Sequence, residues 1–114
     1  MGRLTFKIGD TAKVQILVRD AARVAIDITA YTSIKVKISK SLDIADVDAE
    51  YFGTVLAVDF SNPTDGYHVW NAAAAVTALW EPGQYLFQVQ ITDASGVVTS
   101  TQIQECDIVK NLID

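Results

Sequence analysis

Four carboxylates between residues 43 and 50 form the one dense group of possible metal ligands in this chain of 114 residues. Asp43, Asp46, Asp48 and Glu50 follow the spacing D-x-x-D-x-D-x-E. Calcium favours several oxygen ligands on a flexible loop, but this spacing is not that of an EF-hand, and no glycine stands where that loop must turn. We therefore expect a solvated acidic loop and no bound metal.

The single histidine and the single cysteine are the other residues with reactive side chains. His68 lies in the segment YHVWN, and no motif supplies a nucleophile that it could activate. Cys106 stands between Glu105 and Asp107, whose negative charges disfavour a thiolate. The six glycines are isolated, so there is no phosphate-binding loop and no nucleophile elbow. The sequence predicts no catalytic residue, no cofactor and no enzyme. A hydrolase would need a second titratable group near His68.

Aromatic and apolar residues offer binding rather than catalysis, because aromatic side chains are enriched at interfaces. In the segment 67–71, Tyr67 shares a face with Val69 and His68 shares the other face with Trp70, so one of these faces is expected outside the core. Tyr31, Tyr67 and Trp70, together with Trp80, could form a platform for a sugar ring. The candidate interface residues are Tyr31, Val55, Ala57, Tyr67, His68 and Trp70.

Short strands must position these residues. Alternation of apolar and polar residues predicts strands over 3–8, 12–20, 33–40, 67–71, 83–93 and 97–109, and a shorter strand or edge piece at 24–28. Residues 51–60 are apolar at both parities, which predicts a strand covered on both faces, with a second chain as one possible cover. The alanines of 72–79 predict a short crossover helix capped by Asn71. A parity slip near Gln104 predicts a bulge.

Residues 79–96, LWEPGQYLFQVQITDASG, carry the most specific fold signal. A Pro-Gly turn followed by Tyr85 resembles the start of the F strand in immunoglobulin-like sandwiches. There the tyrosine ring is buried and its hydroxyl binds upstream backbone, an arrangement called the tyrosine corner. Seven or eight strands and one crossover helix predict a single immunoglobulin-like antiparallel β-sandwich over residues 1–114, with a closed barrel as the alternative.

The formal net charge of −5 bears on the partners of this domain. An acidic chain with dispersed lysines and arginines disfavours binding to nucleic acid and to anionic membranes. No apolar run is long enough to span a bilayer, and the N-terminus lacks the apolar core of a signal peptide. One cysteine excludes an intramolecular disulfide, which fits folding in a reducing cytosol. The mean hydropathy of +0.23 indicates apolar surface that meets a partner.

Three segments together resemble a known family. They are GDTAKVQILVRD (9–20), AIDITAYTSIKVKISKS (25–41) and AAAAVTALWEPGQYLFQVQITDASGVVTS (72–100). Their order and spacing are similar to those of small immunoglobulin-like sandwich proteins from the structural gene clusters of tailed bacteriophages and prophages. The resemblance implies a virion structural protein, made in the host bacterial cytoplasm, that binds other virion proteins of the tail, baseplate, neck or head. Because the chain stops at Asp114 without a shaft, we expect an adaptor, connector or decoration subunit.

Two further expectations accompany this interpretation. The apolar strand 51–60 and the aromatic strand 67–71 favour a symmetric homo-oligomer. The alternative function is a carbohydrate-binding or host-adhesion module, based on Tyr31, Tyr67 and Trp70.

Overall fold

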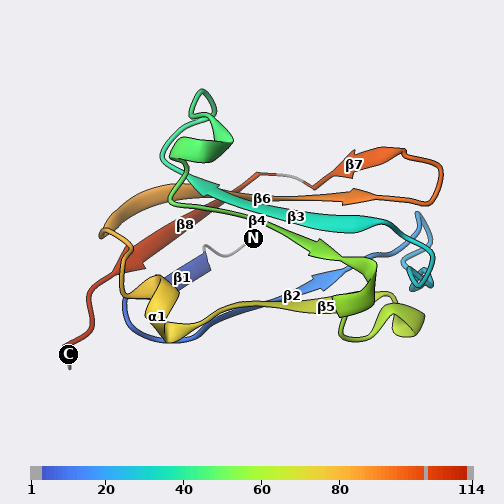
Figure 1. The fold of residues 1–114 in the computed structure, drawn as a ribbon, viewed down its shortest axis with the longest axis horizontal. Helices are drawn as coiled ribbons and strands as arrows, with labels where there is room; N and C mark the ends of the chain where they lie inside the picture. Colours follow the sequence, from blue (N-terminus) through green and yellow to red (C-terminus); the bar gives the residue numbers. More distant parts are fainter. Residues whose placement is uncertain (1–3, 102, 113–114) are drawn as a thin grey trace.

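The computed structural model describes residues 4–101 and 103–112, and these residues form eight β-strands in two sheets (Figure 1). The larger sheet has the strand order β1-β8-β6-β3-β4, with β7 also paired to β6, and the smaller sheet contains β2 and β5. The strands are β1 (Leu4–Lys7), β2 (Ala12–Leu17), β3 (Ser33–Ser39), β4 (Tyr51–Leu56), β5 (Tyr67–Ala72), β6 (Gly83–Thr92), β7 (Val98–Ser100) and β8 (Gln104–Val109). The helical pieces are η1 (Asp46–Asp48), η2 (Ala57–Asp59), η3 (Pro63–Asp65) and α1 (Ala74–Thr77).

The two sheets pack face to face around one core, as expected for an all-β immunoglobulin-like sandwich. On β3, Ile34, Val36 and Ile38 are buried, while Lys35 between them is exposed. This period of two results from the pleat, which points successive side chains to opposite faces. The two sheets are separate, so the architecture is a sandwich and not a closed barrel.

An aromatic cluster fills the centre between the sheets. The ring centroid of Trp70 lies 5.9 Å from that of Phe6 and 5.8 Å from that of Phe87, in edge-to-face geometry. Tyr51 contacts Trp70 in the same way at 5.2 Å, and its hydroxyl accepts a hydrogen bond from Trp70 Nε1 at 3.3 Å. Such pairs contribute about 0.5–1.5 kcal/mol beyond the area they bury. The cluster therefore joins β1, β4, β5 and β6 across the sandwich.

Strands β1 and β8, the first and last of the larger sheet in chain order, are neighbours and pair in parallel. Leu4 lies opposite Cys106 and Phe6 opposite Ile108. Every other strand pair of the described residues is antiparallel. The expectation of a purely antiparallel sandwich is corrected at this one pair, because an end strand can join a sheet in a direction that local sequence does not specify.

The tyrosine corner is present as predicted. Tyr85 is buried, and its hydroxyl lies 2.9 Å from the Glu81 carbonyl oxygen and 2.6 Å from Glu50 Oε2. Glu50 Oε2 also accepts a hydrogen bond from the Glu81 N–H at 3.1 Å. The corner thus joins the start of β6 to the residue that precedes β4.

Two expected strands are shorter than their apolar patterns. The strand expected at 51–60 ends at Leu56, and the 3-10 turn η2 follows it. At 24–28 the structure has one isolated bridge, between Arg19 and Ala25, in place of a strand. Apolar composition favours a strand, but it does not supply a neighbour with which the backbone can pair.

The crossover helix and the last strand also differ from expectation. The helix expected at 72–79 contains only Ala74–Thr77, and Ala73 rather than Asn71 is its N-cap. Asn71 lies in β5 opposite Lys13, so pairing with β2 overrides its preference for a cap. The bulge expected near Gln104 is a break between β7 and β8, at which the Val89 N–H donates to Thr101 Oγ1 at 3.1 Å.

Candidate ligand-binding groove

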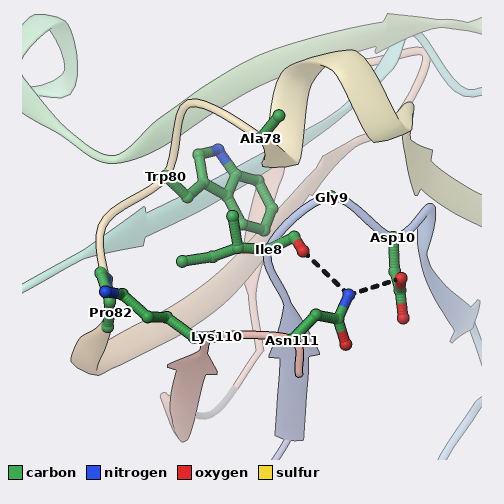
Figure 2. Close-up of a pocket in the computed structure, with 8 residues that line it drawn as sticks. All are labelled: Ile8, Gly9, Asp10, Ala78, Trp80, Pro82, Lys110 and Asn111. Atoms are coloured by element: carbon green, nitrogen blue, oxygen red, sulfur yellow. Dashed lines mark hydrogen bonds between the residues drawn. The ribbon is translucent and has the colours of Figure 1, made fainter. Parts of the chain in front are cut away.

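A groove of about 750 Å³ opens at the end of the sandwich where α1 and the C-terminal residues lie (Figures 1 and 2). Three segments line it: the turn from β1 to β2, the connection from α1 to β6, and the residues after β8. The lining residues are Ile8, Gly9, Asp10, Ala78, Trp80, Pro82, Lys110 and Asn111. Its volume is within the range of about 300–1,000 Å³ that is typical of small-molecule sites.

A threonine of α1 holds one wall of this groove. Thr77 is fully buried, and its Oγ1 donates to the Asp10 carbonyl oxygen at 2.6 Å and accepts from the Gly9 N–H at 3.1 Å. Gly9 has a φ of +88°, a left-handed conformation that glycine adopts without strain. The short helix therefore fixes the turn that presents Asp10 to the groove.

Asn111 fixes the polar side of the groove. Its Nδ2 donates to the Ile8 carbonyl oxygen at 3.0 Å and to Asp10 Oδ1 at 2.8 Å, as Figure 2 shows. Both amide hydrogens are used in these bonds. Asn111 Oδ1 and the second carboxylate oxygen of Asp10 therefore remain as hydrogen-bond acceptors for a ligand. Lys110 extends toward Pro82 in the same view, and its ammonium group is a hydrogen-bond donor.

Apolar side chains form the rest of the lining. Ile8, Ala78 and Pro82 lie beside Trp80, which is only 5% exposed. The Trp80 ring packs edge-to-face against Phe6 at 5.9 Å and Tyr51 at 6.2 Å. Trp80 is thus a rigid wall with little open ring surface. The groove combines apolar contact with two acceptors and a cation.

The structure does not bring the six candidate interface residues together on one surface. Trp70 and His68 are 1% and 7% exposed, because their face of β5 points into the core. Tyr31, Val55 and Ala57 are half-buried and pack against the core. Tyr67, on the other face of β5, is also half-buried.

A sugar platform of Tyr31, Tyr67 and Trp70 therefore does not form. Exposed apolar side chains lie elsewhere, and they include Phe52, Leu56 and Val58 in the segment 51–60. The expectation that 51–60 is covered on both faces is wrong for the described residues: Val55 and Ala57 pack against the core, whereas Leu56 and Val58 are exposed.

His68 clamps a loop. Its Nδ1 accepts a hydrogen bond from the Ser61 N–H at 3.0 Å and lies 3.1 Å from Ser61 Oγ. Ser61 Oγ in turn accepts from the Val69 N–H at 3.2 Å. Burial lowers the pKa of His68, and the negative charge of Asp59 opposes this effect. The imidazole ring holds the segment after η2 against β5 through the bond that Nδ1 accepts.

The acidic loop does not gather its carboxylates. Asp46 forms an ion pair with Lys37, with 2.8 Å between Oδ1 and Nζ, and Glu50 turns toward Tyr85. Within residues 4–101 and 103–112, no group of three or more His, Cys, Asp or Glu side chains is placed to hold a metal ion. Cys106 is fully buried on β8.

The groove residues were not among the candidates from sequence. They come from positions 8–10, 78–82 and 110–111, and no local motif joins these three segments. The one signal available was the Gly9-Asp10 turn, which lies at the start of the first segment that carried the family resemblance.

No protein-family model matches the chain, and no curated protein sequence matches it. Among solved structures, the fold is similar to the Cu(I) solution structure of the chitin-active lytic polysaccharide monooxygenase BlLPMO10A. The sequence identity is 11% and the TM-score is 0.48; the alignment covers 97% of this chain and 60% of that one. This chain therefore spans about 60% of the length of the protein it matches.

This comparison corrects the expected function. The matched structure is described as a chitin-active lytic polysaccharide monooxygenase, which does not agree with a virion structural protein, and we withdraw that assignment. No helix of the described residues is long and apolar enough to cross a membrane.

Proposed function

We propose that this domain is a carbohydrate-binding module and that the groove holds one sugar unit. The observation that carries the proposal is the Asn111–Asp10 pair beside an apolar wall. A sugar ring presents hydroxyl donors at its rim and C–H groups on its faces. Asp10 and Asn111 supply acceptors for the hydroxyls, and Ile8 and Pro82 supply contact for the C–H groups.

The acceptors are oriented before a ligand arrives. Asn111 is tied to the Ile8 backbone and to Asp10, and the Asp10 backbone is tied to Thr77. Such preorganisation lowers the entropy lost on binding. A monosaccharide has roughly 12 non-hydrogen atoms, and about 0.3 kcal/mol per atom gives about 4 kcal/mol, or a Kd of roughly 1 mM. We therefore expect weak binding to one unit.

The test uses the two tryptophans as internal reporters. Trp80 lines the groove and Trp70 lies in the core, so their indole N–H signals in ¹⁵N-resolved NMR report on the site and on the fold respectively. The protein is titrated with a panel of neutral, acidic and N-acetylated monosaccharides and their short oligomers. We expect at least one of these sugars to shift the Trp80 signal and leave the Trp70 signal in place.

Matched variants locate the binding site. Asp10→Ala and Asn111→Ala should abolish the shift. The groove lies at the end of the sandwich with α1, which follows β5 (Figure 1). Asp65→Ala is the control, because it removes an exposed carboxylate from η3, which precedes β5. It should have no effect. The proposal is contradicted if no sugar shifts the Trp80 signal, or if Asp10→Ala and Asp65→Ala change the shift equally.

A further inference from the structure

The outer face of the larger sheet carries a second set of ordered polar and aromatic side chains. The strand registers place Phe52, Lys37 and Gln88 in one row across β4, β3 and β6. Lys35 and Gln90 lie in the next row, two residues further along their strands. Their neighbours along β3 and β6, such as Val36 and Val89, are buried, so these rows face away from the core.

Two adjoining hollows lie over these rows. The first, of about 190 Å³, is lined by Lys35, Lys37, Asp46, Phe52, Gln88 and Gln90. The second, of about 60 Å³, shares Lys37 and Gln88 with the first and continues past Leu42 to Ile103. We refer to the two hollows together as the sheet trough. It crosses β4, β3 and β6, a span of about 10 Å at the usual strand spacing.

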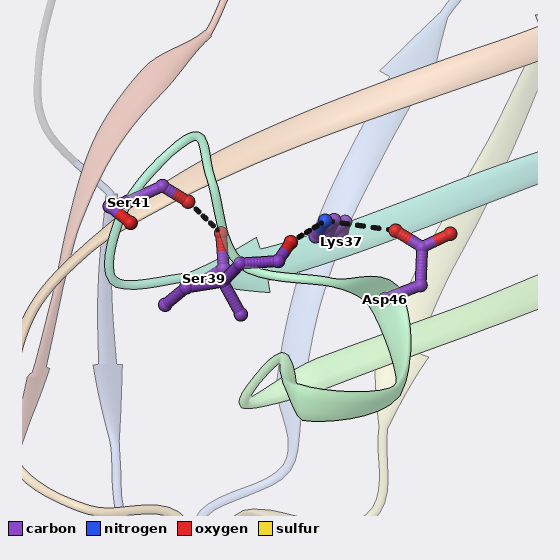
Figure 3. A network of polar contacts seen from close by, with 5 residues as sticks. Lys37, Ser39, Ser41 and Asp46 are labelled. Atoms are coloured by element: carbon purple, nitrogen blue, oxygen red, sulfur yellow. Dashed lines mark hydrogen bonds and ion pairs between the residues drawn. The ribbon is translucent and has the colours of Figure 1, made fainter.

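Hydrogen bonds hold the polar side chains of the sheet trough in place. Lys37 Nζ lies 2.8 Å from Asp46 Oδ1, as Figure 3 shows. It also donates to the Ile44 carbonyl oxygen at 2.6 Å. Ser39 Oγ donates to the Ser41 carbonyl oxygen at 2.8 Å (Figure 3). These bonds tie the segment after β3 to the sheet, so that it forms one wall of the trough.

On the floor of the trough, Gln88 Nε2 donates to the Thr101 carbonyl oxygen at 3.0 Å. Oε1 of Gln88 is not part of that bond and is an acceptor for a ligand hydroxyl. The trough is therefore a shaped surface on rigid strands, the kind of support that precise binding sites use.

We propose that the sheet trough binds a neutral, linear polysaccharide in an extended conformation. Asp46 pairs with Lys37, and Gln88 and Gln90 are uncharged, so Lys35 is the one lining cation without an acidic partner in the hollow. The floor therefore offers mainly amide and ammonium hydrogen-bonding groups, which suit the hydroxyl groups of a sugar. Phe52 is 41% exposed at the β4 edge, and an exposed ring at that place can stack on a sugar face. Leu42 and Ile103, 71% and 44% exposed, offer apolar contact at the other end.

This proposal shares its class of ligand with the proposed function but uses a different surface. The groove lies between three chain segments at the end of the sandwich, and the trough lies on the outer face of the larger sheet. Each surface can therefore be inactivated alone, and the two proposals fail separately.

The test is native affinity electrophoresis of the whole chain in gels that contain hydroxyethyl cellulose, galactomannan or soluble starch, with heparin as the polyanionic comparison. We expect at least one neutral polymer to retard the protein. Phe52→Ala and the double variant Gln88→Ala/Gln90→Ala should each weaken that binding by about fivefold or more.

Two controls separate the trough from other surfaces. Leu17→Ala removes an exposed apolar side chain from β2 in the smaller sheet, and Asp10→Ala disables the groove. Leu17→Ala should be retarded like the unmodified chain, and Asp10→Ala should keep the part of the retardation that Phe52→Ala loses. The proposal is overturned if no neutral polymer retards the protein, if only heparin does, if Phe52→Ala and the double glutamine variant both behave like Leu17→Ala, or if Asp10→Ala alone abolishes retardation.

Discussion

Replacement of Tyr85 by phenylalanine tests the corner that holds the start of β6. The substitution keeps the buried ring and removes the hydroxyl, which lies 2.6 Å from Glu50 Oε2 and 2.9 Å from the Glu81 carbonyl oxygen. A hydrogen bond to a charged group contributes about 1.5–3 kcal/mol. Glu50 keeps its second partner, the Glu81 N–H, so it is not left without a donor. We therefore expect Tyr85→Phe to lower the free energy of unfolding by about 2 kcal/mol.

A double-mutant cycle assigns this loss to the contact with Glu50. Glu50→Gln keeps the shape of the acceptor and removes its charge, so it should cost about 1 kcal/mol. The coupling between the two substitutions should be about 1 kcal/mol, since they share one hydrogen bond. Urea unfolding of the four proteins at neutral pH measures all three quantities, provided that the slope of the free energy against urea is unchanged.

The pH dependence of stability gives a second measurement of the same corner. Burial, and then the hydrogen bond to Glu50, raise the pKa of Tyr85 above its ordinary value of 10.0. The folded state therefore keeps this proton at pH values at which the unfolded state loses it. The stability contributed by the proton is complete below about pH 10 and declines as the pH rises beyond that value. Tyr85→Phe should remove this part of the alkaline decline. A cost of less than about 0.5 kcal/mol together with an unchanged alkaline decline would refute the reasoning.

Three further predictions test the other supports of the fold. Thr77→Val removes the hydroxyl that binds Gly9 and Asp10 and should lower the free energy of unfolding by about 2 kcal/mol. Thr77→Ser keeps the hydroxyl, loses one methyl group and should lower it by about 1 kcal/mol. Urea unfolding measures both losses, and the reverse order would contradict the role of the hydroxyl. His68 is the single histidine, and burial lowers its pKa, so the unfolded state binds a proton more readily than the folded state. Stability should therefore fall as the pH drops below about 6.5. In His68→Phe the urea midpoint should change less between pH 7.5 and 5.5 than in the unmodified chain. Gly66→Ala places a Cβ 2.6 Å from the Ile26 carbonyl oxygen, whereas Gly96→Ala, at a similar positive φ, meets nothing within 4 Å. The second should therefore cost about 1–2 kcal/mol and the first clearly more, as thermal unfolding can show; equal losses would mean that the contact with Ile26 is relieved cheaply.

The sequence by itself determined the elements that depend on neighbouring residues. Alternation along 33–40 and 83–93 predicted β3 and β6 and their buried faces, because the pleat gives a strand a period of two. The Pro-Gly turn before Tyr85 predicted the tyrosine corner, since the hydroxyl reaches backbone only four residues upstream. The parity slip near Gln104 predicted the interruption of the last strand, although not that it is a break rather than a bulge.

Only the tertiary structure decided which face of 67–71 is buried and which residues form sites. Either face of 67–71 could have been internal, and the packing of Trp70 against Phe6, Tyr51 and Phe87 placed His68 and Trp70 inside. The groove depends on two hydrogen bonds between residues that are distant in the sequence. Gly9 and Thr77 are separated by 68 positions, and Asn111 and Ile8 by 103. The sheet trough depends on the pairing of β3 with β4 and β6. Contacts over such distances along the chain leave no local period or spacing in the sequence, because they arise from the packing of whole sheets.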